Sequence, residues 1–264
     1  MSLPVFHAED PALATYTAGD HFLLTGAEAR HAATVRRLGR GELLDVVDGA
    51  GTRVTAEVEA ASKDSLNLTV RATHHADPPA VRFTLVQALA KGDRDLQAVE
   101  ACTELGINDV VAWQAERSVA RFRPERQHKQ LEKWQNTITS AAKQSRRSLW
   151  PVLHEPVDTA GLLRLVESSP QTQWWVLHEQ AEISLVAGLR AQPAEGAEAG
   201  HAGTRGLTDI AVVVGPEGGI SEAELEGLTA RGARAAVLGP EVLRSSTAGA
   251  AAVALLNVVT GRWD

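Results

Sequence analysis

The sequence contains a single cysteine, Cys102, and this scarcity excludes several classes of protein. One thiol allows neither a disulfide framework nor a zinc site built from several cysteines, and it suits a reducing cytosol. The histidines show no metal-ligand spacing either, so we expect no metal. We interpret these as structural or exposed side chains: His31, His74, His75, His154 and His178.

Long hydrophobic runs are also missing. The longest apolar run, AGAAAVALLNVV at residues 248–259, is rich in alanine and too short to span a bilayer. Residues 1–20 show no basic start followed by an apolar segment. We therefore expect a soluble, cytoplasmic protein with no membrane partner. Its 264 residues exceed the usual single domain of about 100 to 200, which favours one large or two unequal domains.

The formal net charge is −7, which by itself argues against a nucleic-acid partner. The distribution of charge argues the opposite. Residues 117–147 contain nine Lys or Arg against two Glu, and residues 30–40 contain four Arg and no acid. Such clusters can follow a phosphate backbone because screening at physiological salt limits the field of distant acids to about 8 Å. The alternative is a solvated helix face without a partner.

The hydrophobic pattern changes in character near residue 80. Residues 42–48, 52–60 and 66–72 are β-like runs separated by hairpin-length turns, which predicts an antiparallel meander in a small barrel. Beyond a proline-containing linker, strands alternate with helices, and this alternation predicts a parallel sheet covered on both faces. Residues 190–206 are low in complexity and read as a surface insertion. We expect strands at 82–89, 109–113, 173–178, 209–214 and 234–239, and helices at 93–105, with Asp93 as N-cap, and at 124–145.

Two Gly-Pro-Glu turns follow predicted strands, where ligands of α/β sheets bind. The first, GPEGGI, leads into Ser221, whose spacing to Glu224 predicts a capping box. Its glycines let backbone amides approach a ligand closely. Glu217 lies inside the turn, and neither a Walker loop nor a GxGxxG fingerprint is present, so we expect a neutral or cationic ligand instead of a phosphate. The alternative is an ordinary glycine-rich connection.

The second turn lies in LGPEVLRSSTAGAAAVALL, residues 238–256. An arginine and three hydroxyl residues follow it, and we expect Ser245, Ser246 or Thr247 to be the N-cap of a helix. The small residues beyond allow another element to pack closely. Two such turns at neighbouring strand ends indicate a single binding site.

These motifs, together with AKGDRDLQAVEACTELGI (90–107), ERSVAR (116–121) and KWQNTITSAAKQSRRSLWP (133–151), resemble the bacterial 16S ribosomal RNA uracil-N3 methyltransferase family of the SPOUT class. The resemblance covers nearly the whole chain. It implies an α/β fold with a C-terminal trefoil-knotted SPOUT domain and parallel sheet at 82–264, a linker at 76–81, and an N-terminal PUA-like RNA-binding barrel at 1–75, with the knot formed from about residue 207 onward.

The resemblance further implies the ligands and partners. S-adenosylmethionine would be the cofactor, two subunits would form a homodimer, and the partner would be 16S ribosomal RNA or the 30S subunit. The reaction would methylate ring N3 of one uridine, number 1498 in the family's target. By resemblance, the cofactor-binding residues are Leu177, Gly215, Gly219, Ile220, Leu238, Gly239, Leu243, Ser245 and Thr247. The expected RNA-binding residues are Arg30, Arg36, Arg37, Arg40, Arg117, Arg146 and Arg147.

The catalytic candidates are Arg244, as stabiliser of a developing anion, and Glu217, as a weaker candidate for the base. Glu217 has an alternative reading as a helix cap or a partner to an arginine. The family often has an acid where this chain has Ser246, which puts a universal base at that position in doubt.

Two features limit the chemistry. Methylation at pyrimidine C5 commonly uses a cysteine nucleophile, but Cys102 lies in the apolar stripe of a predicted helix and is expected to be inert, which favours a nitrogen or oxygen target. Trp134 is expected in the core and not as a stacking platform. A noncatalytic RNA-binding protein with the same fold remains the second hypothesis, and the two hypotheses differ in whether the chain binds the cofactor.

Overall fold

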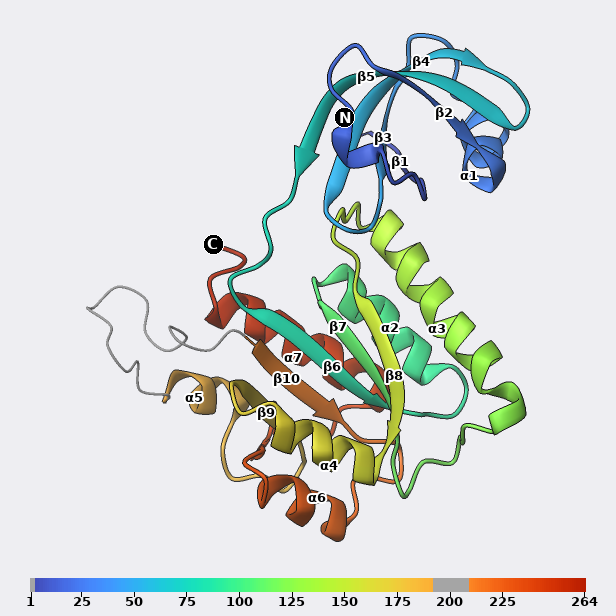
Figure 1. The fold of residues 1–264 in the computed structure, drawn as a ribbon. Helices are drawn as coiled ribbons and strands as arrows, with labels where there is room; N and C mark the ends of the chain where they lie inside the picture. The colour runs from blue at the N-terminus through green and yellow to red at the C-terminus, as the bar shows by residue number, and fades with distance from the viewer. Residues whose placement is uncertain (1–2, 192–208) are drawn as a thin grey trace. The chain divides into compact units, whose positions relative to one another are not determined.

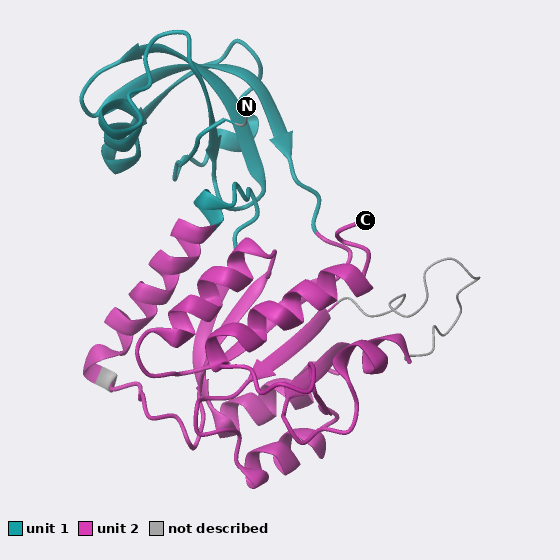
Figure 2. Ribbon diagram, turned by 180° about the vertical axis from the view of Figure 1, so that it is seen from behind, with its two compact units in different colours: residues 1–78, 142–150 teal, residues 79–141, 151–264 magenta. Residues whose placement is uncertain are grey.

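A computed structural model describes residues 3–191 and 209–264 (Figure 1). The chain folds into two compact units (Figure 2). Unit 1 comprises residues 1–78 and 142–150, and unit 2 comprises residues 79–141 and 151–264. Residues 192–206 of the expected surface insertion (190–206) lie outside the described residues. The first residues of the segment expected to be knotted, 207 and 208, also lie outside them.

Unit 1 is built on a five-stranded sheet with the order β1-β3-β4-β5-β2. The antiparallel meander predicted from the sequence is confirmed, because β3 pairs with β4 and β4 with β5 in antiparallel register. The short β1 runs parallel to β3 and makes the sheet mixed. The elements are β1 (Val5–His7), β2 (His21–Thr25), α1 (Gly26–Arg30), β3 (Leu43–Val47), β4 (Thr52–Ala61) and β5 (Ser65–His75).

The core of unit 1 follows from strand alternation. Val54, Ala56 and Val58 of β4 are fully buried, while the residues between them are partly exposed. This period of two places one apolar face of the sheet against α1 and the short π-helix His31–Val35 that continues it. The arginine-rich stretch 30–40 therefore lies on a helical segment and the turn after it.

Residues 142–150 belong to unit 1 although they are distant from it in sequence. The Gly51 amide donates to the Ser148 carbonyl at 2.9 Å, and the Trp150 amide donates to the Gly49 carbonyl at 2.9 Å. Gly49 has φ +76°, and a Cβ there would lie 2.9 Å from the Trp150 ring. Two independent constraints therefore favour glycine at position 49: its backbone conformation and the close packing of the Trp150 ring.

Unit 2 contains a six-stranded sheet with the order β11-β9-β10-β6-β7-β8, and all neighbouring strands in it run parallel. The predicted parallel sheet is therefore confirmed. The strands are β6 (Arg82–Ala88), β7 (Asp109–Gln114), β8 (Val152–Asp158), β9 (Thr172–Leu177), β10 (Asp209–Val214) and β11 (Arg234–Ala236). The helices are α2 (Arg94–Glu104), α3 (Pro124–Gln144), α4 (Thr159–Ser168), α5 (Leu185–Arg190), α6 (Glu222–Thr229) and α7 (Ser245–Val259).

Both faces of this sheet are covered, as the uninterrupted apolar strands predicted. Leu85 joins a core formed with α2, α3, α5 and α7, whereas its neighbour Val86 joins a core formed with α4 and α6. The small residues of α7 allow close packing. A Cβ added to Gly249 would lie 3.0 Å from Leu85 Cδ1 and 3.2 Å from Cys102 Sγ.

The helix caps only partly match the expectations. Ser221 and Glu224 form the predicted capping box at α6. Asp93 occupies the N-cap position of α2, as predicted, but its φ is 56° and its side chain makes no capping hydrogen bond. The prediction of a hydroxyl residue as N-cap of α7 is wrong, because Arg244 occupies that position and the helix begins at Ser245.

The loop that follows β9 has residues at both of its ends that form backbone hydrogen bonds with the end of β11. The His178 amide donates to the Ala236 carbonyl at 3.0 Å. On the other side, the Val237 amide donates to Ile183 and the Leu185 amide donates to Val237, each at 2.9 Å. The chain therefore passes between the two ends of this loop before it forms α7, as a threaded C-terminal segment requires. None of the helices in the described ranges is both long and apolar enough to cross a bilayer.

Candidate functional site

A cavity of about 870 Å³ opens in unit 2 at the carboxyl ends of β9 and β10. Three connections form its walls: residues 177–180 after β9, residues 214–220 after β10, and residues 242–245 before α7. The two Gly-Pro-Glu turns predicted to form one site thus both approach one cavity. The location follows from the parallel sheet, because its strands all deliver their following loops to the same edge.

Close packing explains the glycines of the first turn. A Cβ on Gly215 would lie 2.6 Å from Ile220 Cγ1, and one on Gly218 would lie 3.1 Å from the Arg117 carbonyl oxygen. Gly219 has φ +75°, a conformation that side chains disfavour. The Gly219 amide donates to the Pro216 carbonyl at 2.9 Å and closes the turn. The packing of Ile220 and Arg117 against this turn leaves little room for side chains at Gly215 and Gly218.

The glutamates of this region have different roles. Glu217 Oε1 accepts the Lys91 amide at 3.1 Å and Arg94 Nη1 at 3.0 Å. Its reading as a partner to an arginine is therefore what the structure shows. Glu224 is buried, and its carboxylate accepts bonds from three donors: the Ser221 amide at 3.0 Å, the Glu116 amide at 2.8 Å and the Thr159 hydroxyl at 2.6 Å. Glu224 thus joins α6 to two other segments and is not available to a ligand.

The second turn contributes a buried polar atom. Ser245 lines the cavity and is 7% exposed, and its Oγ has no hydrogen-bond partner among the described residues. Arg244, just before it, also lines the cavity. Val242 and Leu243 stand on the same wall and are 75% and 41% exposed. The cavity therefore combines one unpaired hydroxyl, a cation and an apolar edge.

The structure brings most of the expected site residues to this cavity, but not all. Leu238 lines a small adjoining pocket of about 90 Å³ instead. Gly239 and Thr247 line neither pocket, and the Thr247 hydroxyl donates to the Arg244 carbonyl at 3.2 Å. The expected residues that line the main cavity are Arg117, Leu177, Gly215, Glu217, Gly219, Ile220, Leu243, Arg244 and Ser245.

Sequence reasoning missed several lining residues. His178 and Glu179 come directly after β9, and their position at a strand end was the available signal. Glu222, in the first turn of α6, also lines the cavity, so that three acids (Glu179, Glu217 and Glu222) face an uncharged or cationic ligand. Arg94 had no signal of its own, because its place in the wall depends on its ion pair with Glu217.

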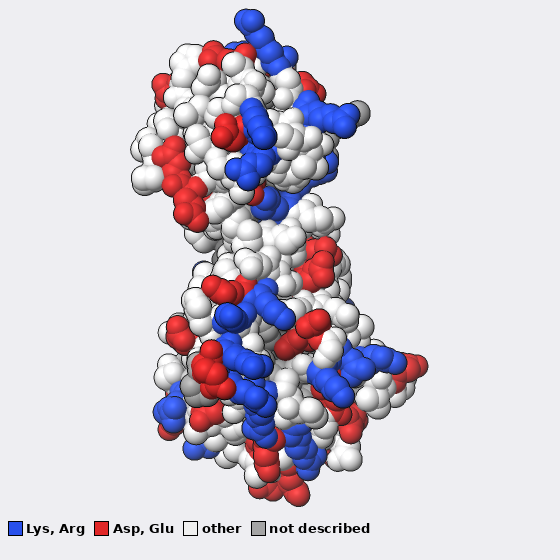
Figure 3. All heavy atoms as spheres, turned by 90° about the vertical axis from the view of Figure 1, so that its right-hand side faces the viewer, with Lys and Arg blue, Asp and Glu red and all other residues white. Residues whose placement is uncertain are grey.

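The expected RNA-binding arginines fall into two groups. Six of them, Arg30, Arg36, Arg37, Arg40, Arg146 and Arg147, belong to unit 1, whereas Arg117 belongs to unit 2. On the face of unit 2 where α3 lies, Lys and Arg side chains are interspersed with Asp and Glu side chains (Figure 3). Arg126, Lys129 and Lys133 of this helix are exposed, and so are Glu125 and Glu132. The loop before α3 adds a surplus of positive charge, with Arg117, Arg121 and Arg123 exposed against Glu116, and such a surplus suits a phosphate backbone.

Cys102 and Trp134 do not contribute to the cavity. Burial raises the pKa of the Cys102 thiol to about 12, and the side chain is fully enclosed, so the prediction of a buried thiol is confirmed. Trp134 is 2% exposed and belongs to the core, as expected. Within residues 3–191 and 209–264, no group of three His, Cys, Asp or Glu side chains is arranged to hold a metal ion.

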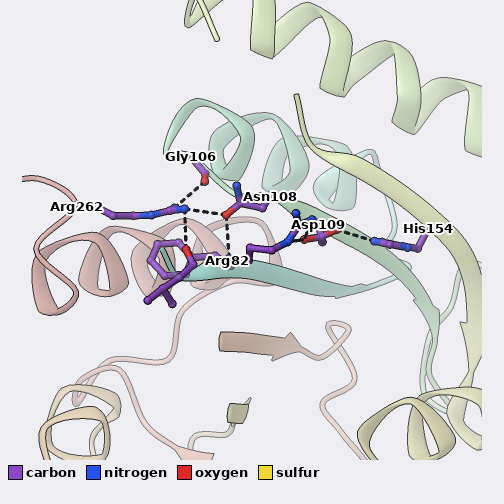
Figure 4. Close-up of polar contacts among 8 residues, drawn as sticks. Arg82, Gly106, Asn108, Asp109, His154 and Arg262 are labelled. Carbon is purple, nitrogen blue, oxygen red and sulfur yellow. Dashed lines mark hydrogen bonds and ion pairs between the residues drawn. The ribbon is translucent and has the colours of Figure 1, made fainter. Parts of the chain in front are cut away.

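A second polar cluster lies at the opposite, amino-terminal edge of the sheet (Figure 4). Arg82 of β6 forms a bidentate pair with Asp109 of β7, and His154 of β8 bonds the same carboxylate at 2.8 Å. Beside it, Arg262 donates to the carbonyls of Gly106 and Val81. Burial lowers the pKa of Arg262. This cluster ties strand starts and the C-terminus together, away from the cavity.

Comparisons with known proteins agree with this geometry. The chain matches the RNA methyltransferase domain family over residues 77–257 and the RNA methyltransferase PUA domain family over residues 24–71. It is 40% identical over 244 residues to "Ribosomal RNA small subunit methyltransferase E" of Mycobacterium bovis, which spans 92% of this chain and 88% of the relative. The protein of the same description from Bacillus subtilis is 27% identical over 242 residues, with 90% of each chain covered.

A solved structure shares the fold. The ribosomal RNA small subunit methyltransferase E from Neisseria gonorrhoeae, determined bound to S-adenosyl methionine, superposes with a TM-score of 0.81 over 98% of each chain at 24% identity. Together with the mixed sheet of unit 1 and the parallel sheet of unit 2, this likeness confirms the expected fold class: a PUA-like N-terminal part and a SPOUT-type knotted α/β part.

Proposed function

The chain belongs to the ribosomal RNA small subunit methyltransferase E family, and we propose that it methylates ring N3 of one uridine, number 1498 in the family's target, in 16S ribosomal RNA with S-adenosylmethionine as methyl donor. The observation that carries this proposal is the cavity formed by the first Gly-Pro-Glu turn and by residues 242–245, which directly follow the second. Its walls offer backbone, acids and three arginines (Arg94, Arg117 and Arg244), which is the chemistry that such a reaction needs.

The lining residues fit the proposed cofactor. Gly215 and Gly219 leave backbone exposed to an adenosine or amino-acid group, and the Ser245 hydroxyl offers an unpaired donor and acceptor. The three acids of the wall (Glu179, Glu217 and Glu222) balance its three arginines, and Glu179 and Glu222 suit a ligand with a sulfonium and an ammonium. When bound, S-adenosylmethionine supplies an electrophilic methyl group on its sulfonium.

Arg244 has the central role in the proposed chemistry. Uracil N3 carries a proton at neutral pH, so the base must release this proton to solvent water as N3 accepts the methyl group. The Arg244 guanidinium lines the cavity and stabilises the uracil anion that results. Glu217 acts as a positioning residue through Arg94, because its Oε1 accepts both the Lys91 amide and Arg94 Nη1. Holding the uracil ring in line with the methyl group lowers the activation free energy further, by up to about 7 to 11 kcal/mol in well-oriented reactions.

The remaining parts of the proposal concern the partners. The PUA-like unit 1 anchors the RNA through Arg30, Arg36, Arg37 and Arg40, and the substrate is 16S RNA or the 30S subunit in the cytoplasm. Two chains form a homodimer, for which the exposed Val242 and Leu243 beside the cavity offer an apolar contact. Light scattering of the purified chain tests the last point, and a monomer at micromolar concentration contradicts it.

Calorimetry with S-adenosylmethionine, followed by mass spectrometry of 16S RNA treated with the protein, tests the main proposal. We expect heat of binding and one added methyl group on a uridine, at N3. Heat of binding with a methyl group at another atom contradicts the N3 assignment. No heat and no methyl group would favour the second hypothesis, in which the fold binds RNA without catalysis.

A further inference from the structure

A second cavity, of about 270 Å³, lies beside the methylation cavity within unit 2. Two loops line both. Lys91 lines the second cavity, and its amide bonds Glu217, which lines the first. Arg117 lines the first cavity, and Val119, two residues on, lines the second. The cavities are therefore neighbours separated by thin walls.

The interior of the second cavity is apolar with one unpaired polar atom. Leu89, Leu96 and Ala120 line its sides. Gln130 Oε1 is buried in its wall and has no hydrogen-bond partner in the part of the chain that the structure describes, while Nε2 donates to the Arg121 carbonyl at 3.5 Å. A buried carbonyl without a donor costs free energy, so a ligand that donates an N–H group there is favoured.

Charge at the rim points to a polyanion. Lys91 and Lys133 are exposed at the rim, and Asp93 and Asp95 also line the cavity. The Asp95 carboxylate accepts the Ala90 and Leu96 amides and is turned toward the backbone. The lining itself is thus balanced, and so are the other exposed charges of α3, where Arg126 and Lys129 are accompanied by Glu125 and Glu132. The surplus positive charge comes from the loop before α3, where Arg117, Arg121 and Arg123 are exposed against Glu116.

We propose that this second cavity binds one nucleobase of the substrate RNA, next to the nucleotide whose base enters the methylation cavity, with Gln130 Oε1 accepting a hydrogen bond from its Watson–Crick edge. The proposal rests on the proposed function, because it takes the first cavity as the site of the target base. The volume lies just below the about 300 to 1,000 Å³ of ordinary ligand pockets, which suits a single heterocycle. Proteins commonly read single-stranded RNA by splaying bases into such apolar pockets.

Binding measurements with the full chain test this proposal. The probes are fragments of 16S RNA around the methylated uridine, each with one flanking nucleotide made abasic, and affinity is measured by fluorescence anisotropy. The variants are Gln130→Ala and, as matched control, Gln135→Ala, which removes the same side chain from an exposed position of the same helix outside the cavity. Val119→Asp adds a carboxylate at a rim residue that is 70% exposed, so the fold is not at risk.

We expect one abasic position to weaken binding to the unaltered chain about fivefold, the factor that corresponds to one hydrogen bond of about 1 kcal/mol. Gln130→Ala should weaken binding by a similar factor and then show no further loss at that abasic position. The Val119→Asp variant should likewise show no loss of affinity at that abasic position, whereas Gln135→Ala should show the same fivefold loss as the unaltered chain.

Independent effects of Gln130→Ala and of every abasic position would overturn the proposal, as would unchanged RNA affinity of Gln130→Ala. Methyl transfer to the unaltered RNA is measured in parallel. Methyl transfer without the coupling refutes the second cavity as a base site and leaves the proposed function intact. Coupling without any methyl transfer refutes the proposed function and supports the base site.

Discussion

Replacing Glu217 by glutamine separates a positioning role from a role as general base. The carboxylate accepts the Lys91 amide at 3.1 Å and Arg94 Nη1 at 3.0 Å. Glutamine keeps an oxygen for the amide but loses the charge that holds Arg94. The two side chains are 38% and 25% exposed, so solvent screens the ion pair and its contribution is about 0.2 to 1 kcal/mol.

From this bound, Glu217→Gln should reduce kcat/KM by about fivefold or less, with the same factor at every pH. A general base contributes about 10² to 10⁴ to the rate, and its loss changes the pH profile. The assay is transfer of labelled methyl groups to 16S RNA or 30S subunits. The pH is varied from roughly 6 to 9.5, because a general base with a pKa near neutrality titrates in that range. Arg94→Ala and the double variant should show the same loss as Glu217→Gln, because both remove one interaction.

The reasoning is refuted if Glu217→Gln loses about a hundredfold or more in kcat and the acidic limb of the pH profile disappears, while cofactor affinity is unchanged. Additive losses for Arg94→Ala and Glu217→Gln would show that the ion pair is not how Glu217 acts. Glu226→Gln is a matched control, because Glu226 is exposed on α6, lies outside the cavity and makes no ion pair among the described residues.

Further predictions concern three other residues. Arg244→Ala should lower turnover by about 10² to 10³, the loss typical for one donor to a developing anion, and change RNA affinity much less; equal losses would contradict its role. Cys102, whose thiol has a pKa of about 12, should resist iodoacetamide in the folded chain and react after unfolding in guanidinium, and fast labelling of the folded chain would contradict its burial. Arg262→Ala should lower the free energy of unfolding by about 2 to 4 kcal/mol in urea titration, because it leaves the Gly106 and Val81 carbonyls without their donor. Arg231→Ala, at an ion pair of 3.9 Å, is the control expected to change stability by less than about 0.5 kcal/mol.

The elements that the sequence predicted are those whose signal is local. β10 reads as DIAVVV, a continuous apolar run, and the structure buries five of its six residues. The short strands β1 and β2 and the exposed strand β8 escaped prediction, because three to seven residues with mixed polarity carry no period of their own. Their positions in the sheets depend on partners far away in sequence.

The candidate site shows the same division. The Gly-Pro-Glu turns could be found because glycine and proline mark backbone constraints directly. Arg94 could not be found, since its place in the cavity wall depends on an ion pair across more than a hundred residues of chain, with Glu217. Gln130 could not be identified from the sequence either, because its candidate role depends on the burial of its amide oxygen in a cavity wall.

The sequence by itself determined the two kinds of architecture, the basic stretches and the two turns, because each depends on residues close together in the chain. Only the tertiary structure decided that residues 142–150 complete unit 1, that the end of β11 passes between the ends of the loop after β9, and that Glu217 is paired. The physical reason is that hydrophobic period and turn chemistry act over a few residues, whereas pairing of buried and charged groups acts through space between segments that the sequence does not place together.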